Sequence, residues 1–255
     1  MLSLIQADLL KTGKRPMGWM LLALSVLLVS ATLLTIRFLI PEELPPEALN
    51  PYNALVMGPQ FVQQSIGGLL IIVFGASLAG NEYGYDTWKN LLIRRPRRTP
   101  FIVSKWLTLV FSIGLGLIVL AAVSLAMSFG VGLLTDGGAG MSWGAALLTL
   151  LMQLVSLTVV GALALMGTVI GRSTVAGIIV GFVWFIFDGV MAQLPWVSAS
   201  VKGLLFSVSE ANLLTYISGQ EAAYPPAQSV LVIAVYLVAP LIAAALVFRQ
   251  RDIAG

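Results

Sequence analysis

Six long apolar runs constrain this chain more than any other feature of its sequence. About 20 consecutive apolar residues are enough to cross the hydrocarbon core of a bilayer as a helix. The chain is 58% hydrophobic and 10% charged, with a mean hydropathy of +0.97, whereas soluble domains are nearer half apolar and a quarter charged. We therefore predict one all-α integral membrane domain over residues 1–255. Its six transmembrane helices are expected at about 17–40, 61–80, 101–135, 145–170, 175–194 and 229–248.

The third run is too long for a simple span. Thr99 and Pro100 have the pattern of an N-cap followed by proline at the first helical position. From there to Thr135 a helix would be roughly 54 Å long, at about 1.5 Å per residue. We expect tilt, projection beyond the membrane, or a break near Gly130 and Gly132, and the sequence does not choose among these three.

The composition excludes several classes of protein and of functional site. The chain has no cysteine and no histidine, so it cannot form a disulfide framework, a histidine-based catalytic triad or a histidine–cysteine zinc site. We expect no catalytic residues, no metal ligands and no nucleic-acid partner. The chain also lacks the G-x-x-x-x-G-K-[ST] phosphate loop of an ATPase.

The basic residues predict an orientation in the membrane. If six spans are drawn, twelve of the fourteen Lys and Arg residues fall on the side of the two termini, and only Arg37 and Lys202 fall on the other. Basic residues are enriched in cytoplasmic loops. We therefore expect a multi-pass protein of the cell (inner) membrane with both termini in the cytoplasm.

Two segments outside the spans have helical patterns. Residues 2–12 place Leu2, Ile5 and Leu9 on one face, and Gly13 follows as a possible C-cap, which predicts a short interfacial helix. An unstructured basic start to the first span is the alternative.

The outer segment 195–228 is apolar for a loop, and we expect one or two short helices that lie on the outer leaflet or enter it. There, Ser207-x-x-Glu210 fits a capping box and Gly219 fits a helix stop.

Small residues recur at four-residue spacing within the runs. The pairs are Ala76 and Gly80, Gly167 and Gly171, and Gly177 and Gly181. Such pairs allow helices to approach closely in lipid. Packing within the chain and a seam between two copies are both compatible with this pattern.

A basic, amphipathic insert separates the second and third runs. Six of the fourteen basic residues lie between Gly80 and Lys105. From Asn81 onward, Tyr85, Trp88, Leu91 and Leu92 share one helical face, while Glu82, Asp86, Lys89 and Asn90 share the other. Contact with anionic lipid explains the arginines. The acidic and aromatic half in front of them suits a protein groove better.

These features resemble the permease subunits of ATP-binding-cassette transporters, in the type-two exporter class with the type V fold. In that family the first cytoplasmic loop reads approximately E-x-x-x-G-T, then P-S-R, then K at the start of the third span. The matching residues here are Glu82, Thr87, Pro96, Arg98 and Lys105. Asp86 stands where the family usually has glycine, and Arg97 stands where it has serine.

The resemblance implies that residues 81–100 contain a coupling helix, which docks in a groove of a separate ATPase subunit, with Tyr85 and Trp88 as the expected aromatic anchors. It implies two ATPase copies with two permease copies, as a homodimer or a heterodimer. It also implies small re-entrant helices before the last span. This chain would hold no cofactor, and ATP and magnesium would bind in the partner.

Asp188 supports an alternative function. It is the one acidic residue well inside a predicted span, and such a carboxylate suggests an ion or proton site of a secondary transporter. Its position about seven residues before Pro195 also allows a solvated place near the outer interface, with no function. An intramembrane enzyme is disfavoured because no polar residues cluster inside the spans.

Overall fold

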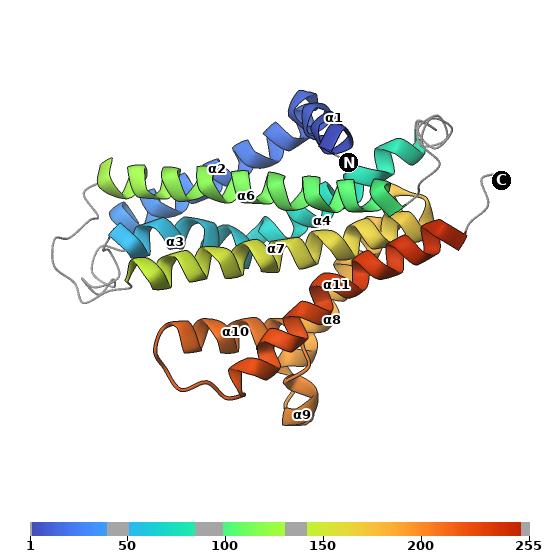
Figure 1. Cartoon of the computed structure of the whole chain (residues 1–255). Helices are drawn as coiled ribbons and strands as arrows, with labels where there is room; N and C mark the ends of the chain where they lie inside the picture. The colour runs from blue at the N-terminus through green and yellow to red at the C-terminus, as the bar shows by residue number, and fades with distance from the viewer. Residues whose placement is uncertain (1, 40–50, 85–98, 131–141, 251–255) are drawn as a thin grey trace.

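The computed structural model describes residues 2–39, 51–84, 99–130 and 142–250, and every regular element in these ranges is a helix (Figure 1). The predicted all-α fold is therefore confirmed for the described part of the chain. Five of the predicted site residues, namely Tyr85, Thr87, Trp88, Pro96 and Arg98, lie outside the described residues.

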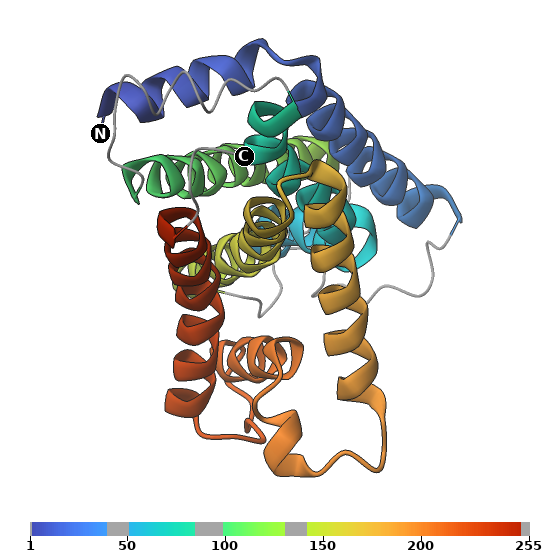
Figure 2. The same cartoon turned by 90° about the vertical axis from the view of Figure 1, so that its right-hand side faces the viewer.

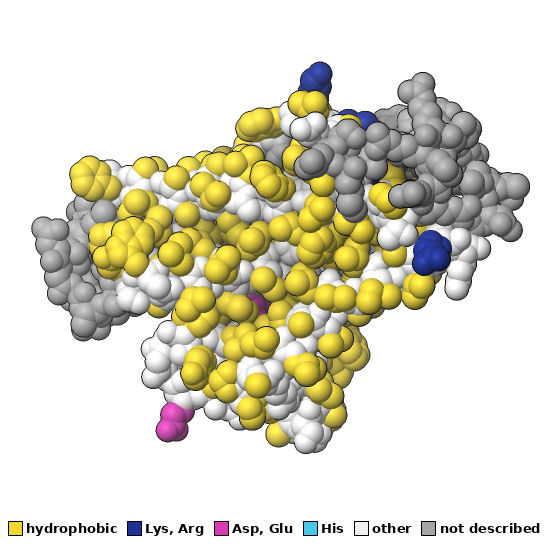
Figure 3. All heavy atoms as spheres, in the orientation of Figure 1, with side chains coloured by type: hydrophobic (Ala, Val, Ile, Leu, Met, Phe, Trp, Pro, Cys, Tyr) yellow, Lys and Arg dark blue, Asp and Glu magenta, His cyan; other side chains and the backbone are white. Residues whose placement is uncertain are grey.

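Within the described residues, five helices are long and apolar enough to cross a membrane. They are α2 (Pro16–Leu39), α6 (Thr99–Gly130), α7 (Trp143–Gly171), α8 (Thr174–Gln193) and α11 (Pro226–Gln250). Helix α6 begins at the predicted Thr99 and ends at Gly130, so the long third run is one 32-residue helix up to that point. Hydrophobic side chains cover much of the described surface in Figure 3, as expected where lipid is the solvent.

The predicted span 61–80 lies within an interrupted helical path. This path consists of α3 (Pro51–Val62), the π-helical turn η2 (Gln63–Gly67) and α4 (Gly68–Gly84). Pro59 lies inside α3, where it cannot donate a backbone hydrogen bond and its ring crowds the preceding turn. Helix α4 continues to Gly84, four residues beyond the predicted end of the span, so Glu82 belongs to its last turn.

Helix α7 is the centre of the bundle. In both Figure 1 and Figure 2 it runs through the middle of the molecule, and it contacts α3, α4, α6, α8, α10 and α11. Of its most hydropathic stretch, 61% is buried, against 11% for α2. The apolar core around it includes Ile102, Leu109 and Leu165.

Glycines allow the closest contacts around α7. A Cβ added to Gly75 of α4 would lie 2.9 Å from Cα of Gly161 on α7, and a Cβ on Gly177 of α8 would lie 2.6 Å from the carbonyl oxygen of Ala164. A Cβ on Gly181 would lie 3.0 Å from Ile72 on α4. These small residues therefore pack helices of one chain together, which is the first of the two interpretations of their spacing.

Helices α8 and α11 extend away from the bundle and enclose two short helices at their far ends (Figures 1 and 2). These are α9 (Ala199–Lys202) and α10 (Phe206–Ile217), within the segment where short helices were predicted. Phe206 packs against Trp184 of α8 and Tyr236 of α11, with ring centroids 5.7 and 5.8 Å away. Gly219, with φ of 77°, follows the end of α10.

The N-terminal segment is a helix, α1 (Leu2–Lys14), and it continues past the predicted cap at Gly13. It crosses the end of the bundle in Figure 2 and packs against α6. The chain bends at Arg15, whose amide donates to the carbonyl of Thr12 at 3.2 Å, and α2 begins at Pro16. Its position in the membrane interface stays a prediction.

Candidate functional site

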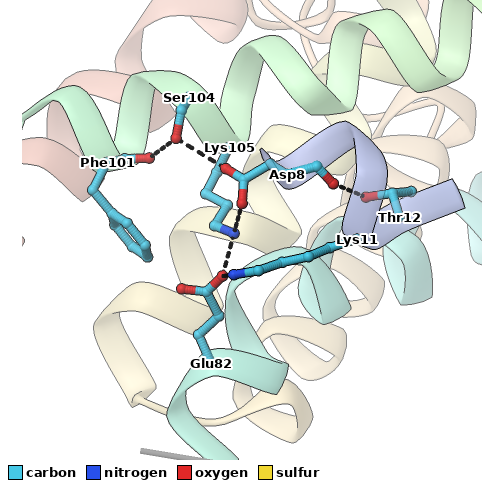
Figure 4. A network of polar contacts seen from close by, with 7 residues as sticks. All are labelled: Asp8, Lys11, Thr12, Glu82, Phe101, Ser104 and Lys105. Carbon is cyan, nitrogen blue, oxygen red and sulfur yellow. Dashed lines mark hydrogen bonds and ion pairs between the residues drawn. The ribbon is translucent and has the colours of Figure 1, made fainter. Parts of the chain in front are cut away.

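A buried ion cluster joins α1, α4 and α6 at the end of the bundle where the 85–98 loop begins and ends (Figure 4). The ammonium of Lys105 lies 2.7 Å from Oδ1 of Asp8 and 2.6 Å from Oε1 of Glu82. All three residues are nearly inaccessible, at 3%, 6% and 2% exposed. Each comes from a different helix, so the cluster holds three elements together.

Neighbouring side chains complete the cluster. The Ser104 hydroxyl donates to Oδ2 of Asp8 at 3.0 Å. Lys11, which is 45% exposed, lies 3.4 Å from Oε1 of Glu82. The ammonium of Lys105 also lies 5.3 Å from the centroid of the Phe101 ring, within cation–π range.

Among the described residues, the charges of the cluster balance. Two carboxylates, Asp8 and Glu82, face two ammonium groups, Lys11 and Lys105. Burial of an uncompensated charge is costly, and loss of one partner from a buried pair typically costs about 3–5 kcal/mol. The cluster is therefore stable only while α1, α4 and α6 keep their relative positions.

The cluster connects the helices on either side of residues 85–98. Glu82 lies two residues before the end of α4, and Lys105 lies six residues after the start of α6. Their ion pair therefore links the last turn of α4 to the start of α6, and Asp8 links both helices to α1.

Two of the predicted coupling residues, Glu82 and Lys105, are thus brought together. However, Glu82 was expected on the polar face of an amphipathic helix that starts near Asn81, and in the structure it lies instead in the last turn of α4 with its side chain buried. Asp8 is a further member of the cluster that was not predicted from the sequence. The available signal was its acidic charge in a segment otherwise rich in apolar and basic residues.

Asp188 is part of a second polar arrangement, near α10. It is 4% exposed, and its Oδ1 and Oδ2 accept hydrogen bonds from the backbone amides of Phe206 and Ser207, both at 2.9 Å. These amides belong to the first turn of α10, where backbone donors lack partners within the helix. The predicted solvated, unengaged place for Asp188 is therefore wrong, and its carboxylate attaches α10 to α8.

The predicted capping box is also wrong. Helix α10 begins after Leu205, and no side chain of its own caps it; the carboxyl group of Asp188 accepts from its first two amides instead. Glu210 faces the bundle instead. Its carboxylate accepts hydrogen bonds from Nε2 of Gln63 at 2.6 Å and from the hydroxyl of Ser156 at 3.0 Å.

The Glu210 carboxyl therefore connects α10 with η2 and α7. Burial raises its pKa above the ordinary value of 4.5, and the charge of Asp188 raises it further, while the hydrogen bonds from Gln63 and Ser156 lower it. The pattern of the sequence did not reveal this contact, because Gln63 and Glu210 are 147 residues apart.

The family comparison agrees with this architecture. A family profile described as "ABC-2 family transporter protein" matches residues 4–188, which is more than half of the chain. This range includes the ion cluster, the 85–98 loop and Asp188. A comparison with curated proteins found no match. The chain belongs to the ABC-2 transporter family and is a multi-pass, membrane-spanning component of a transport system.

Proposed function

We propose that this chain is the permease subunit of an ATP-driven exporter, and that a separate ATPase docks on the 81–100 loop. ABC-2 permeases normally work with an ABC ATPase. ATP and magnesium would bind in that partner, and the complex would contain two ATPase copies and two permease copies. The two permeases would be identical or different chains.

The observation that carries the proposal is the buried cluster of Asp8, Glu82 and Lys105 at the base of the loop. A loop that only contacts lipid headgroups has no need of a buried, charge-balanced connection between three helices. A loop that transmits force does, because a flexible base would absorb the displacement. Ion pairs with 2.6 and 2.7 Å separations resist such loss.

The mechanism follows from this connection. Closure of the ATPase dimer on ATP would displace the docked loop. The cluster would pass this displacement to α4 and α6 together and to α1 beside them, as a rigid-body movement of helices. Rearrangement of α4 and α6 around α7 would then open and close the path of the substrate.

The test is substitution of the expected aromatic anchor of the loop. Tyr and Trp dominate the binding energy of small interfaces, so Trp88→Ala should reduce co-purification of the ATPase, or uncouple ATP hydrolysis from transport. Trp196→Ala is the matched control, because Trp196 is 77% exposed and lies between α8 and α9. It should leave both unchanged.

The basic residues of the loop distinguish docking from lipid contact. If the ATPase binds the loop, Arg94→Ala and Arg95→Ala should have smaller effects than Trp88→Ala, and these effects should diminish at high salt. If the loop contacts only lipid, the arginines should matter more than the tryptophan. Unchanged complex yield and unchanged transport for Trp88→Ala would reject the proposed docking site.

A further inference from the structure

An apolar cavity of about 230 Å³ lies between α1, α2 and α6, with η2 and α4 behind it. Its walls include Leu9, Leu22, Leu70, Ile113 and Leu117. It reaches the lipid-facing surface, because the lining residues Trp19, Phe111 and Leu115 are 62%, 67% and 62% exposed. We call it the α1–α2–α6 groove.

The groove offers little to water. Four side chains with polar atoms line it, namely Thr12, Trp19, Ser25 and Ser112. The first three donate to the carbonyls of Asp8, Gly13 and Leu21, at 2.9, 2.7 and 2.9 Å. A water molecule needs about two to four polar partners, and an apolar cavity of about 150 Å³ stays dry and accepts benzene. A larger apolar groove that opens into lipid is suited to an alkyl chain.

One end of the groove is basic. Thr12 and Gly13 line it, and Lys14 and Arg15 follow directly where α1 ends and the chain turns into α2. The indole N–H of Trp19 donates to Gly13 here, and tryptophan favours the level of the headgroups. The groove therefore has a positive mouth at headgroup level and an apolar interior.

We propose that the groove holds one acyl chain of an anionic phospholipid, whose headgroup phosphate meets Lys14 and Arg15. Juxtamembrane basic residues attract anionic lipid. The lipid would support α1 next to the ion cluster, since Leu9 and Thr12 line the groove while Asp8 enters the cluster.

A second copy of the chain fits the groove less well. Of the acidic residues that the structure describes, Asp8, Glu82 and Asp188 are buried, and Glu210 accepts bonds from Gln63 and Ser156. Glu221 is the exposed carboxylate among these residues. It lies between α10 and α11, far from α1 in the fold. The described part of a second copy thus brings no carboxylate to the basic mouth, whereas a phospholipid brings its phosphate.

The experiment fills the groove from two walls. A Cβ on Gly116 of α6 meets no atom within 4 Å, and one on Gly18 of α2 meets only Thr12, at 3.7 Å or more. Both glycines line the groove, so Gly116→Leu and Gly18→Leu should occupy it without distorting the helices. Gly189→Leu on α8 is the matched control, because a Cβ there also meets nothing within 4 Å and Gly189 does not line the groove.

Full-length protein in neutral detergent is titrated with phosphatidylglycerol or phosphatidylcholine of equal chain length, and native mass spectrometry counts the bound lipid. Wild type and Gly189→Leu should bind one phosphatidylglycerol per chain, at least several-fold more tightly than phosphatidylcholine. Gly116→Leu and Gly18→Leu should weaken both lipids at least tenfold. Lys14→Gln with Arg15→Gln should reduce phosphatidylglycerol binding to the level of phosphatidylcholine.

Several results would overturn the proposal. If both Leu variants bind lipid as tightly as the wild type does, any bound lipid lies outside the groove. If the wild-type chain prefers neither lipid, the proposed site does not exist. A dimer that becomes monomeric in Gly116→Leu, with lipid binding unchanged, would identify the groove as an interface between copies. Thermal unfolding of each variant verifies that it is folded, so that loss of binding reports on the groove.

Discussion

Lys105 is the residue on which the ion cluster depends. Its ammonium contacts both Asp8 and Glu82, whereas Lys11 contacts Glu82 from a half-exposed position. Without Lys105, the buried carboxylate of Asp8 would lose the cation that contacts it, and Glu82 would keep the half-exposed Lys11 at 3.4 Å. The loss would destabilise the packing of α1, α4 and α6 together, because each of these helices contributes at least one member of the cluster.

We therefore predict that Lys105→Met lowers the free energy of unfolding by about 3–5 kcal/mol, the usual effect of breaking a buried ion pair. Lys202→Met, on the short helix α9, should change it by no more than about 0.5 kcal/mol. Thermal unfolding of the purified proteins measures both. Equal unfolding temperatures for the two variants would show that the cluster adds nothing to stability.

Glu210 predicts a dependence of stability on pH. Burial raises its pKa in the folded chain above 4.5, so this carboxyl binds protons more strongly folded than unfolded. Its contribution to stability is complete below 4.5 and is lost as the pH rises through the folded pKa. Glu210→Gln keeps a side-chain oxygen for the donors of Gln63 and Ser156 and removes the titration.

The measurement is the difference in unfolding temperature between wild type and Glu210→Gln from acidic to neutral pH. The wild type should lose stability relative to the variant as the pH rises. Glu210→Ala should be less stable than Glu210→Gln at every pH, since it removes the acceptor of the buried Ser156 hydroxyl and one of the two acceptors of the Gln63 amide group. A difference that is independent of pH would mean that the carboxyl does not change its protonation on folding.

At the scale of helices, Asp188 attaches α10 to α8. Each hydrogen bond to a charged acceptor contributes about 1.5–3 kcal/mol, and both oxygens are engaged. Asp188→Ala should therefore accelerate hydrogen exchange at the amides of Phe206 and Ser207, while Asp188→Asn, which retains one oxygen, should have a smaller effect. Glu221→Ala is the control on an exposed carboxylate.

The same substitutions test the role of Asp188 in transport. Asp188→Asn should slow transport modestly and leave ATP hydrolysis by the partner intact, because the change affects the attachment of α10. Complete dependence of transport on this carboxylate and on a proton gradient would contradict a purely structural role.

The contact between α4 and α7 depends on two facing glycines. A Cβ on Gly75 would collide with the backbone of Gly161, which cannot move aside as a side chain can. Gly75→Ala should therefore destabilise the bundle, although alanine favours helix over glycine by about 1 kcal/mol. Gly189→Ala, which meets open space, should be neutral or slightly stabilising. A higher unfolding temperature for Gly75→Ala than for wild type would contradict the close approach.

On the scale of the whole molecule, the two polar arrangements lie toward opposite ends of the bundle. The ion cluster joins α1 to α4 and α6, while Asp188 and Glu210 hold α10 between α7 and α8. If the basic loop is cytoplasmic, the first arrangement faces the ATPase and the second lies toward the outer side. Substrate movement would occur between them, along helices that surround α7.

Cysteine labelling tests this orientation directly, because the native chain has no cysteine to remove. Ser218→Cys, at the exposed end of α10, should react with a membrane-impermeant maleimide in intact cells. Asn90→Cys in the basic loop should react only after the membrane is permeabilised. Labelling of Asn90→Cys in intact cells would reverse the orientation and remove the proposed docking of an ATPase.

The sequence by itself determined the fold class and the approximate places of the helices. Apolar runs of bilayer length exclude a soluble fold, and the Thr99–Pro100 pair marks the start of α6 because its chemistry is local. The family resemblance also depended on local order along the chain, from Glu82 to Lys105. Such signals can be recognised without a structure, because they lie in the composition and in short-range patterns of the sequence.

Only the tertiary structure decided which polar residues meet. Asp8 and Lys105 are 97 residues apart, and Gln63 and Glu210 are 147 residues apart, so no periodicity connects them. Asp188 caps a helix that begins 18 residues later, where the local pattern favoured Ser207. A buried charge must find a partner in space, and the packing of α4 and α6 around α7 determines which partner is within reach.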